Sequence, residues 1–157
     1  MHMKRFLFVT SFIIASATGA IAQKLAAAEV KELVNNKTYV FEAETARPTA
    51  GGTRHLTPGY TLKVNGDSLN ADLPYYGKSY TAPMNPSDVG IKVTSTDFDY
   101  SVADGKKNSY EVFIKPKDKV YNSEFNLTVY DNGTAYLQVT SPDRQSISFN
   151  GYIKAVK

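Results

Sequence analysis

The chain has 157 residues, a formal net charge of +3, eleven tyrosines, and neither cysteine nor tryptophan. Without cysteine it cannot form disulfides, thiolate metal sites or cysteine nucleophiles, so a hydrophobic core must hold the fold. Its 18 basic and 15 acidic residues are scattered along the chain, which gives no electrostatic basis for binding nucleic acid.

The N-terminus, residues 1–22, has the three parts of a secretory signal peptide. Lys4 and Arg5 form a short positive region, an apolar run follows, and small residues precede a predicted cut after Ala22. The apolar run is shorter than the 20 or so residues that a membrane span needs. We therefore expect residues 23–157 to form a single β-rich domain, without a membrane span, that is exported to the periplasm or the cell exterior. Removing Lys4 and Arg5 leaves 16 basic and 15 acidic residues, a net charge of +1.

One short helix is predicted at the start of this product, over residues 25–35. Leu25, Val30, Leu33 and Val34 fall near one stripe at helical spacing. Two asparagines then end the run.

After the helix the period of the apolar residues changes to two. Nine segments alternate in this way: 38–46, 60–64, 68–73, 90–95, 97–102, 110–115, 125–129, 134–139 and 146–153. The intervening positions are mostly polar, which favours antiparallel pairing with one face in water. Tight-turn sequences such as Asn65-Gly66 join several of the segments.

These patterns predict a mainly β protein with one short N-terminal helix. Eight or nine strands would form an antiparallel meander that closes into a barrel or a strongly curved sheet, because a flat sheet would leave exposed edges. The helix would lie against an open end or an edge of this sheet. A two-sheet β-sandwich is the alternative that the pattern leaves open.

No catalytic constellation emerges from the sequence. His55 is the single histidine after the signal peptide, it lies in a glycine-rich loop, and no hydrolase or phosphate-binding motif surrounds it. Asp97 and Asp99 project from the same face of a strand. This placement would suit a cation site or an acid–base pair, and it equally suits the solvent-exposed face of a half-buried strand. We therefore expect no enzyme activity, no cofactor and no metal site.

The tyrosines in the predicted strands fall into two groups, according to the face of the strand from which they project. Four share a face with core residues: Tyr39, Tyr60, Tyr100 and Tyr110. Three lie on the opposite parity of consecutive strands, and are predicted to form a stripe on the outer face: Tyr130, Tyr136 and Tyr152. Cross-strand aromatic pairs stabilise sheets, and exposed tyrosines also bind carbohydrate or protein partners.

The segment LPYYGKSYTAPM, residues 73–84, concentrates rings where prolines and a glycine prevent regular structure. It has two interpretations: a plug that caps one end of the barrel, or a binding loop that presents the rings. The candidate ligand-binding residues are Tyr75, Tyr76 and Tyr80, with Arg54 and Arg144 as polar contacts.

Several motifs together resemble one known family. They are AETARP (43–48), LTPGYTLKVNGD (56–67), LPYYGKSYTAP (73–83), GIKV (90–93), IKPKD (114–118), GTAYLQV (133–139) and DRQSISFNGYI (143–153). Their order is similar to that in a family of secreted proteins from Bacteroidetes, catalogued only as a domain of unknown function. The resemblance covers nearly the whole chain after residue 22. It implies an exported, single-domain, β-rich protein, and it brings no known activity, ligand or catalytic residue.

Two functional hypotheses follow. The first is a non-catalytic binding protein for an apolar or amphiphilic small molecule in the barrel, or for a glycan on a tyrosine surface. The second is an envelope protein-interaction module, such as an inhibitor, chaperone or assembly partner. The first predicts a ligand cavity of roughly 300–1,000 Å³, and the second a packed interior with an exposed tyrosine face.

Overall fold

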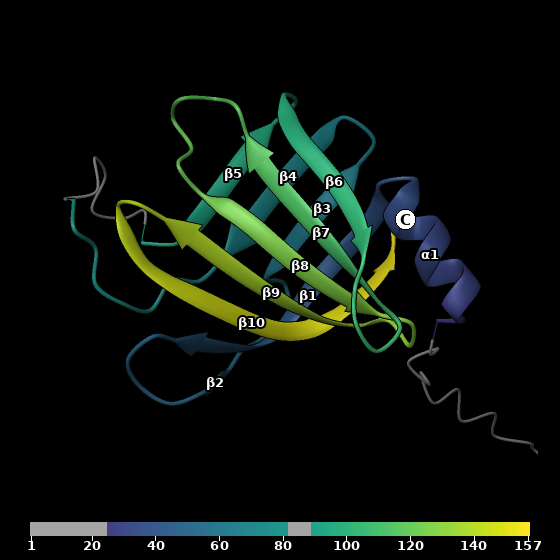
Figure 1. The fold of residues 1–157 in the computed structure, drawn as a ribbon. Helices are drawn as coiled ribbons and strands as arrows, with labels where there is room; N and C mark the ends of the chain where they lie inside the picture. The colour runs from purple at the N-terminus through teal and green to yellow at the C-terminus, as the bar shows by residue number, and fades with distance from the viewer. Residues whose placement is uncertain (1–24, 82–88) are drawn as a thin grey trace, which may run out of the picture.

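The computed structural model describes residues 25–81 and 89–157, which form a strongly curved antiparallel sheet and one helix (Figure 1). The predicted signal peptide, residues 1–22, lies outside the described residues. The chain is mostly β, and its strands build a nearly closed barrel-shaped sheet, as predicted. All described strands belong to this one sheet, so the two-sheet sandwich does not form.

The helix and all nine predicted strands are present, with small differences at their ends. Their bounds are α1 Ala27–Asn35, β1 Thr38–Pro48, β2 Arg54–His55, β3 Thr61–Asn65, β4 Ser68–Leu73, β5 Ile91–Ser95, β6 Phe98–Asp104, β7 Ser109–Pro116, β8 Glu124–Tyr130, β9 Thr134–Ser141 and β10 Arg144–Ala155. The additional strand, β2, has two residues and pairs with Thr45 and Ala46 of β1. The sequence did not predict it, because two residues cannot show an alternating pattern.

The strands follow the order β5-β4-β3-β1-β10-β9-β8-β7-β6. Closure depends on β1 and β10, which pair antiparallel from Tyr39 with Ala155 to Pro48 with Ile147. The two edge strands of the order, β5 and β6, are consecutive in sequence but do not pair with each other. The barrel therefore remains open along one seam.

Inward-facing side chains fill the middle of the barrel. Eight of the large ones are 0% exposed: Tyr39, Phe41, Leu62, Leu69, Phe125, Leu127, Leu137 and Phe149. A side chain with no accessible surface cannot border a cavity that admits even a water molecule. These rings and branched chains therefore leave no room for a ligand beside them.

Helix α1 lies at one end of the barrel, against β1 and β7 (Figure 1). It buries Val30, Leu33 and Val34, and the hydroxyl of Tyr100 on β6 donates a hydrogen bond to the Val34 carbonyl oxygen at 2.7 Å. Burial raises the pKa of Tyr100 to about 12, so this hydroxyl keeps its proton and the hydrogen bond further into the alkaline range than an ordinary tyrosine would. Within the described ranges, no helix is both long and apolar enough to cross a membrane.

A close approach between β1 and β10 requires glycine at position 151. Gly151 faces Ala43, next to a register shift between Ala43 and Thr45. A Cβ atom on Gly151 would lie 1.9 Å from the backbone oxygen of Glu42, which no side-chain rotation can relieve. Alanine at this position would have to separate the two strands that close the barrel.

We expect Gly151→Ala to lower the free energy of unfolding by about 1–3 kcal/mol, because the added methyl overpacks backbone against backbone. Urea denaturation followed by circular dichroism measures the loss. The control is Gly52→Ala, where an added Cβ meets nothing within 4 Å. That variant should change stability by less than about 0.5 kcal/mol. Equal midpoints for the two variants would contradict the tight approach.

Candidate functional site

Four of the five predicted site residues form two stacked arginine–tyrosine pairs. The guanidinium carbon of Arg54, on β2, is 4.7 Å from the ring centre of Tyr76. The guanidinium carbon of Arg144, at the start of β10, is 4.9 Å from the ring centre of Tyr75. Tyr80, the fifth residue, takes no part in these stacks and is 67% exposed. An arginine over a tyrosine ring is attracted by the ring's electron-rich face.

Hydrogen bonds hold the segment that carries these tyrosines against the start of β10. The Tyr75 hydroxyl lies 2.9 Å from the carbonyl oxygen of Lys78 and 3.0 Å from that of Gln145, so its one proton is shared between these two acceptors. The backbone N–H of Gln145 donates to the carbonyl oxygen of Lys78 at 3.0 Å, and the backbone N–H of Tyr80 donates to the carbonyl oxygen of Asp143 at 2.7 Å. The segment is thus fixed by residues that are distant in sequence.

The two interpretations of this segment each describe part of it. The rings of Tyr75 and Tyr76 are half-buried and pack against the core, as a plug requires. Tyr80 is exposed, as a binding loop requires. Residues 82–84 of the predicted segment lie outside the described residues.

A hollow of about 390 Å³ opens beside the stacked pairs. We call it the tyrosine–arginine hollow; its ring-bearing walls are Tyr60, Tyr75 and Tyr76, and Asp72 and Lys92 also line it. Tyrosine is uncharged at neutral pH, and burial raises the pKa of Tyr75 further, against the opposing effect of Arg144. The hollow therefore offers neutral aromatic surface.

The two arginines lie beside the hollow, stacked on rings that line it, while the charged side chains that line it directly are Asp72 and Lys92. The guanidinium of Arg144 donates a hydrogen bond to the Gly90 carbonyl at 3.1 Å, which ties it to the wall. The Arg54 side chain forms no hydrogen bond or ion pair with any residue that the structure describes, and it is exposed. Its N–H donors remain available to an incoming acceptor.

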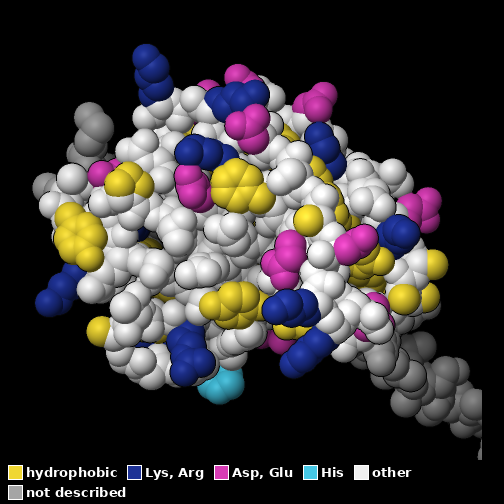
Figure 2. All heavy atoms as spheres, in the orientation of Figure 1, with side chains coloured by type: hydrophobic (Ala, Val, Ile, Leu, Met, Phe, Trp, Pro, Cys, Tyr) yellow, Lys and Arg dark blue, Asp and Glu magenta, His cyan; other side chains and the backbone are white. Residues whose placement is uncertain are grey.

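The three tyrosines predicted on the outer face do lie there, in an offset arrangement. Tyr130 and Tyr136 are 36% and 37% exposed. Tyr136 lies opposite Thr128 on β8 and Asn150 on β10, so no tyrosine faces it directly. Figure 2 shows this side of the molecule: the centre of the face carries mostly side chains that are neither charged nor hydrophobic.

Asp97 and Asp99 project from the same face of the strand region, as predicted, and both contact one lysine. Lys117 Nζ lies 3.4 Å from Asp97 and 3.2 Å from Asp99, and all three side chains are well exposed. This is a surface ion-pair arrangement on the edge strand β6, where charge discourages pairing with other chains. No group of three or more acidic or histidine side chains suited to a metal occurs among the described residues.

Taken together, these features define a small, nearly closed β-barrel with one capping helix and surface hollows. The chain belongs to the family described as Domain of unknown function (DUF4251), whose model matches residues 22–153. The resemblance drawn from the sequence motifs is confirmed at the level of this family.

The crystal structure of a DUF4251 family protein from Bacteroides eggerthii DSM 20697 has a similar fold. The TM-score is 0.67 at 14% sequence identity, and the alignment covers 85% of this chain and 90% of that chain. At this identity the likeness shows the fold alone. No curated protein matches the sequence.

We expect Tyr75→Phe to loosen the segment that carries the tyrosines. Losing this hydroxyl should lower the free energy of unfolding by about 0.5–1.5 kcal/mol and speed amide hydrogen exchange at Tyr80 and Gln145. Tyr80→Phe is the matched control, because its hydroxyl makes no hydrogen bond with a described residue. If both variants exchange at the wild-type rate, the Tyr75 hydroxyl does not hold the segment.

Proposed function

We propose that this chain is an exported, non-catalytic binding protein of the bacterial periplasm or cell exterior that takes a ligand in the tyrosine–arginine hollow. The observation that carries the proposal is the pair of stacks, in which Arg54 and Arg144 lie over two rings that line one hollow. The signal-peptide pattern of residues 1–22 supports export. The source of the solved family member, Bacteroides eggerthii, supports an origin in Bacteroidetes.

The chemistry of the hollow favours an amphiphilic small molecule with an anionic group. Ring faces of Tyr60, Tyr75 and Tyr76 offer apolar contact area, which suits an aliphatic or ring-shaped body. A guanidinium binds a carboxylate, phosphate or sulfate in a two-pronged geometry. Because the large inward-facing side chains leave no room beside them, this ligand would bind at the surface rather than in the middle of the barrel.

The test is a titration of the ¹⁵N-labelled protein, purified after export in a bacterial host, with two eight-carbon amphiphiles below their micelle concentrations. Sodium octanoate carries a carboxylate, and octyl glucoside has the same chain with an uncharged head. Octanoate should shift the amide signals of Tyr76 and Gly90 saturably. Octyl glucoside should bind about tenfold more weakly, since it lacks the charge-assisted contact.

Two arginine variants make the test specific. Arg54→Gln should weaken octanoate binding about tenfold, because it removes the available guanidinium. Arg47→Gln is the matched control, since Arg47 is an exposed arginine with no tyrosine stacked on it. Equal effects of the two variants, or equal affinity for the two amphiphiles, would contradict an anion-selective hollow.

The second candidate function, an envelope protein-interaction module, is favoured by the packed side chains in the middle of the barrel and by the exposed rings of Tyr130 and Tyr136 on the outer face. A protein partner would use these rings and would leave the hollow without a small-molecule ligand. The two functions separate in the same titration: the interaction module predicts no saturable shift at Tyr76 or Gly90 with either amphiphile.

A further inference from the structure

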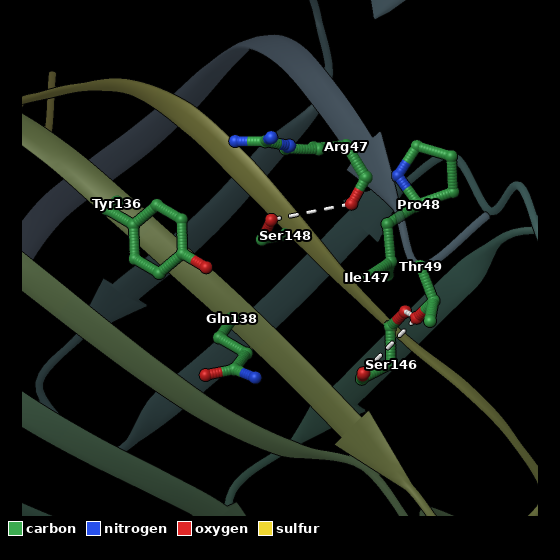
Figure 3. Close-up of a pocket in the computed structure, with 8 residues that line it drawn as sticks. All are labelled: Arg47, Pro48, Thr49, Tyr136, Gln138, Ser146, Ile147 and Ser148. Atoms are coloured by element: carbon green, nitrogen blue, oxygen red, sulfur yellow. Dashed lines mark hydrogen bonds between the residues drawn. The ribbon is translucent and has the colours of Figure 1, made fainter. Parts of the chain in front are cut away.

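A second hollow, of about 310 Å³, lies on the outer face of the barrel where β1, β10 and β9 run side by side (Figure 3). We call it the polar groove. Six of its eight lining residues carry polar side chains: Arg47, Thr49, Tyr136, Gln138, Ser146 and Ser148. It shares no lining residue with the tyrosine–arginine hollow.

Strand register assembles this groove. Arg47 on β1 faces Ser148 on β10, and Ser148 faces Gln138 on β9, so the three form one row across three strands. Tyr136 lies two residues before Gln138 and therefore projects from the same face of β9. Figure 3 shows Arg47, Tyr136 and Gln138 arranged around Ser148.

The short side chains fix the walls of the groove. The Thr49 hydroxyl donates to the Ser146 carbonyl oxygen at 2.7 Å, and the Ser148 hydroxyl donates to the Arg47 carbonyl oxygen at 3.4 Å. These bonds join the end of β1 to β10. The groove is therefore held by cross-strand hydrogen bonds rather than by a free loop.

The long side chains around the groove have no hydrogen-bond or ion-pair partner among the described residues. The Arg47 guanidinium, the Gln138 amide and the Tyr136 hydroxyl form no hydrogen bond or ion pair with any residue in the described ranges. No carboxylate lines the groove. The site thus presents a planar cation, an amide that both donates and accepts, and a phenol, all open to solvent.

We propose that the polar groove binds a neutral oligosaccharide. Each sugar hydroxyl is both a donor and an acceptor, which matches the mixed chemistry of Gln138, Tyr136 and the lining serines. The Tyr136 ring offers an apolar face to the C–H surface of a sugar. A planar guanidinium donates two parallel hydrogen bonds to neighbouring oxygens on one ring.

Other ligand classes fit the groove less well. A hydrocarbon would find only Pro48, Ile147 and one tyrosine ring, and Ile147 is 2% exposed. A highly charged anion would find a single cation, Arg47, among the lining residues. Nucleic acid needs a row of basic side chains along its backbone, and the groove has none.

The experiment is a titration of the ¹⁵N-labelled protein with maltohexaose, cellohexaose and mannohexaose, with hexagalacturonate as an acidic comparison. At least one neutral hexasaccharide should cause saturable shifts at Tyr136, Gln138 and Ser148. Failure of all three neutral sugars overturns the proposal. Saturation with hexagalacturonate alone also overturns it, because the site would then recognise an anion.

Variants locate the binding. Gln138→Ala and Tyr136→Phe should each weaken the interaction at least fivefold, and both replace exposed side chains whose loss leaves the core untouched. Tyr130→Phe is the matched control, since Tyr130 is equally exposed on the same face but does not line the groove. Equal weakening by Tyr130→Phe would place the sugar elsewhere. Arg54→Gln should leave sugar binding unchanged, so this proposal and the tyrosine–arginine hollow fail independently.

Discussion

The pairing of β1 with β10 is the constraint on which the rest of the structure depends. It joins the first long strand to the last, and so turns a meander into a nearly closed barrel. It also assembles the polar groove, because it places Arg47 beside Ser148. The other edge of β1 pairs with β2, which carries Arg54. Gly151 permits the close approach at the bulge in this pairing.

Closure in this register drives the large rings inward and determines where binding can take place. Phe41 on β1 and Phe149 on β10 belong to neighbouring strands and are completely buried, together with Tyr39 and Phe125. Their packing stabilises the fold without disulfides, since each buried ring removes a large apolar area from water. A barrel filled in this way has no interior site beside these rings. The proposed ligand sites therefore lie on the surface.

The strands and the helix could be predicted because their signals are local. Apolar residues that alternate with polar ones predicted all nine longer strands, and apolar residues at helical spacing predicted α1. The two-residue strand β2 could not be found in this way. It forms because β3 covers β1 only as far as Glu42, which leaves Thr45 and Ala46 to pair with another segment.

The candidate site was predictable as a set of residues but not as a geometry. A cluster of rings pointed to Tyr75 and Tyr76, whereas their pairing with Arg144 and Arg54 depends on contacts between distant segments. The polar groove was missed. Strand parity could have placed Arg47 and Gln138 on the outer face, but only the register across β10 brings them into one row. Register is a property of the closed sheet, and no local pattern encodes it.

The most direct test of a filled interior is methyl NMR under xenon pressure, since xenon enters apolar cavities that exclude water. The inward leucines Leu62, Leu127 and Leu137 come from three different strands and report on the middle of the barrel. A filled interior predicts no saturable xenon-dependent shift of their methyl signals. Saturable shifts at these methyls would reveal an internal cavity, and would contradict the packed interior on which the proposed surface sites rest.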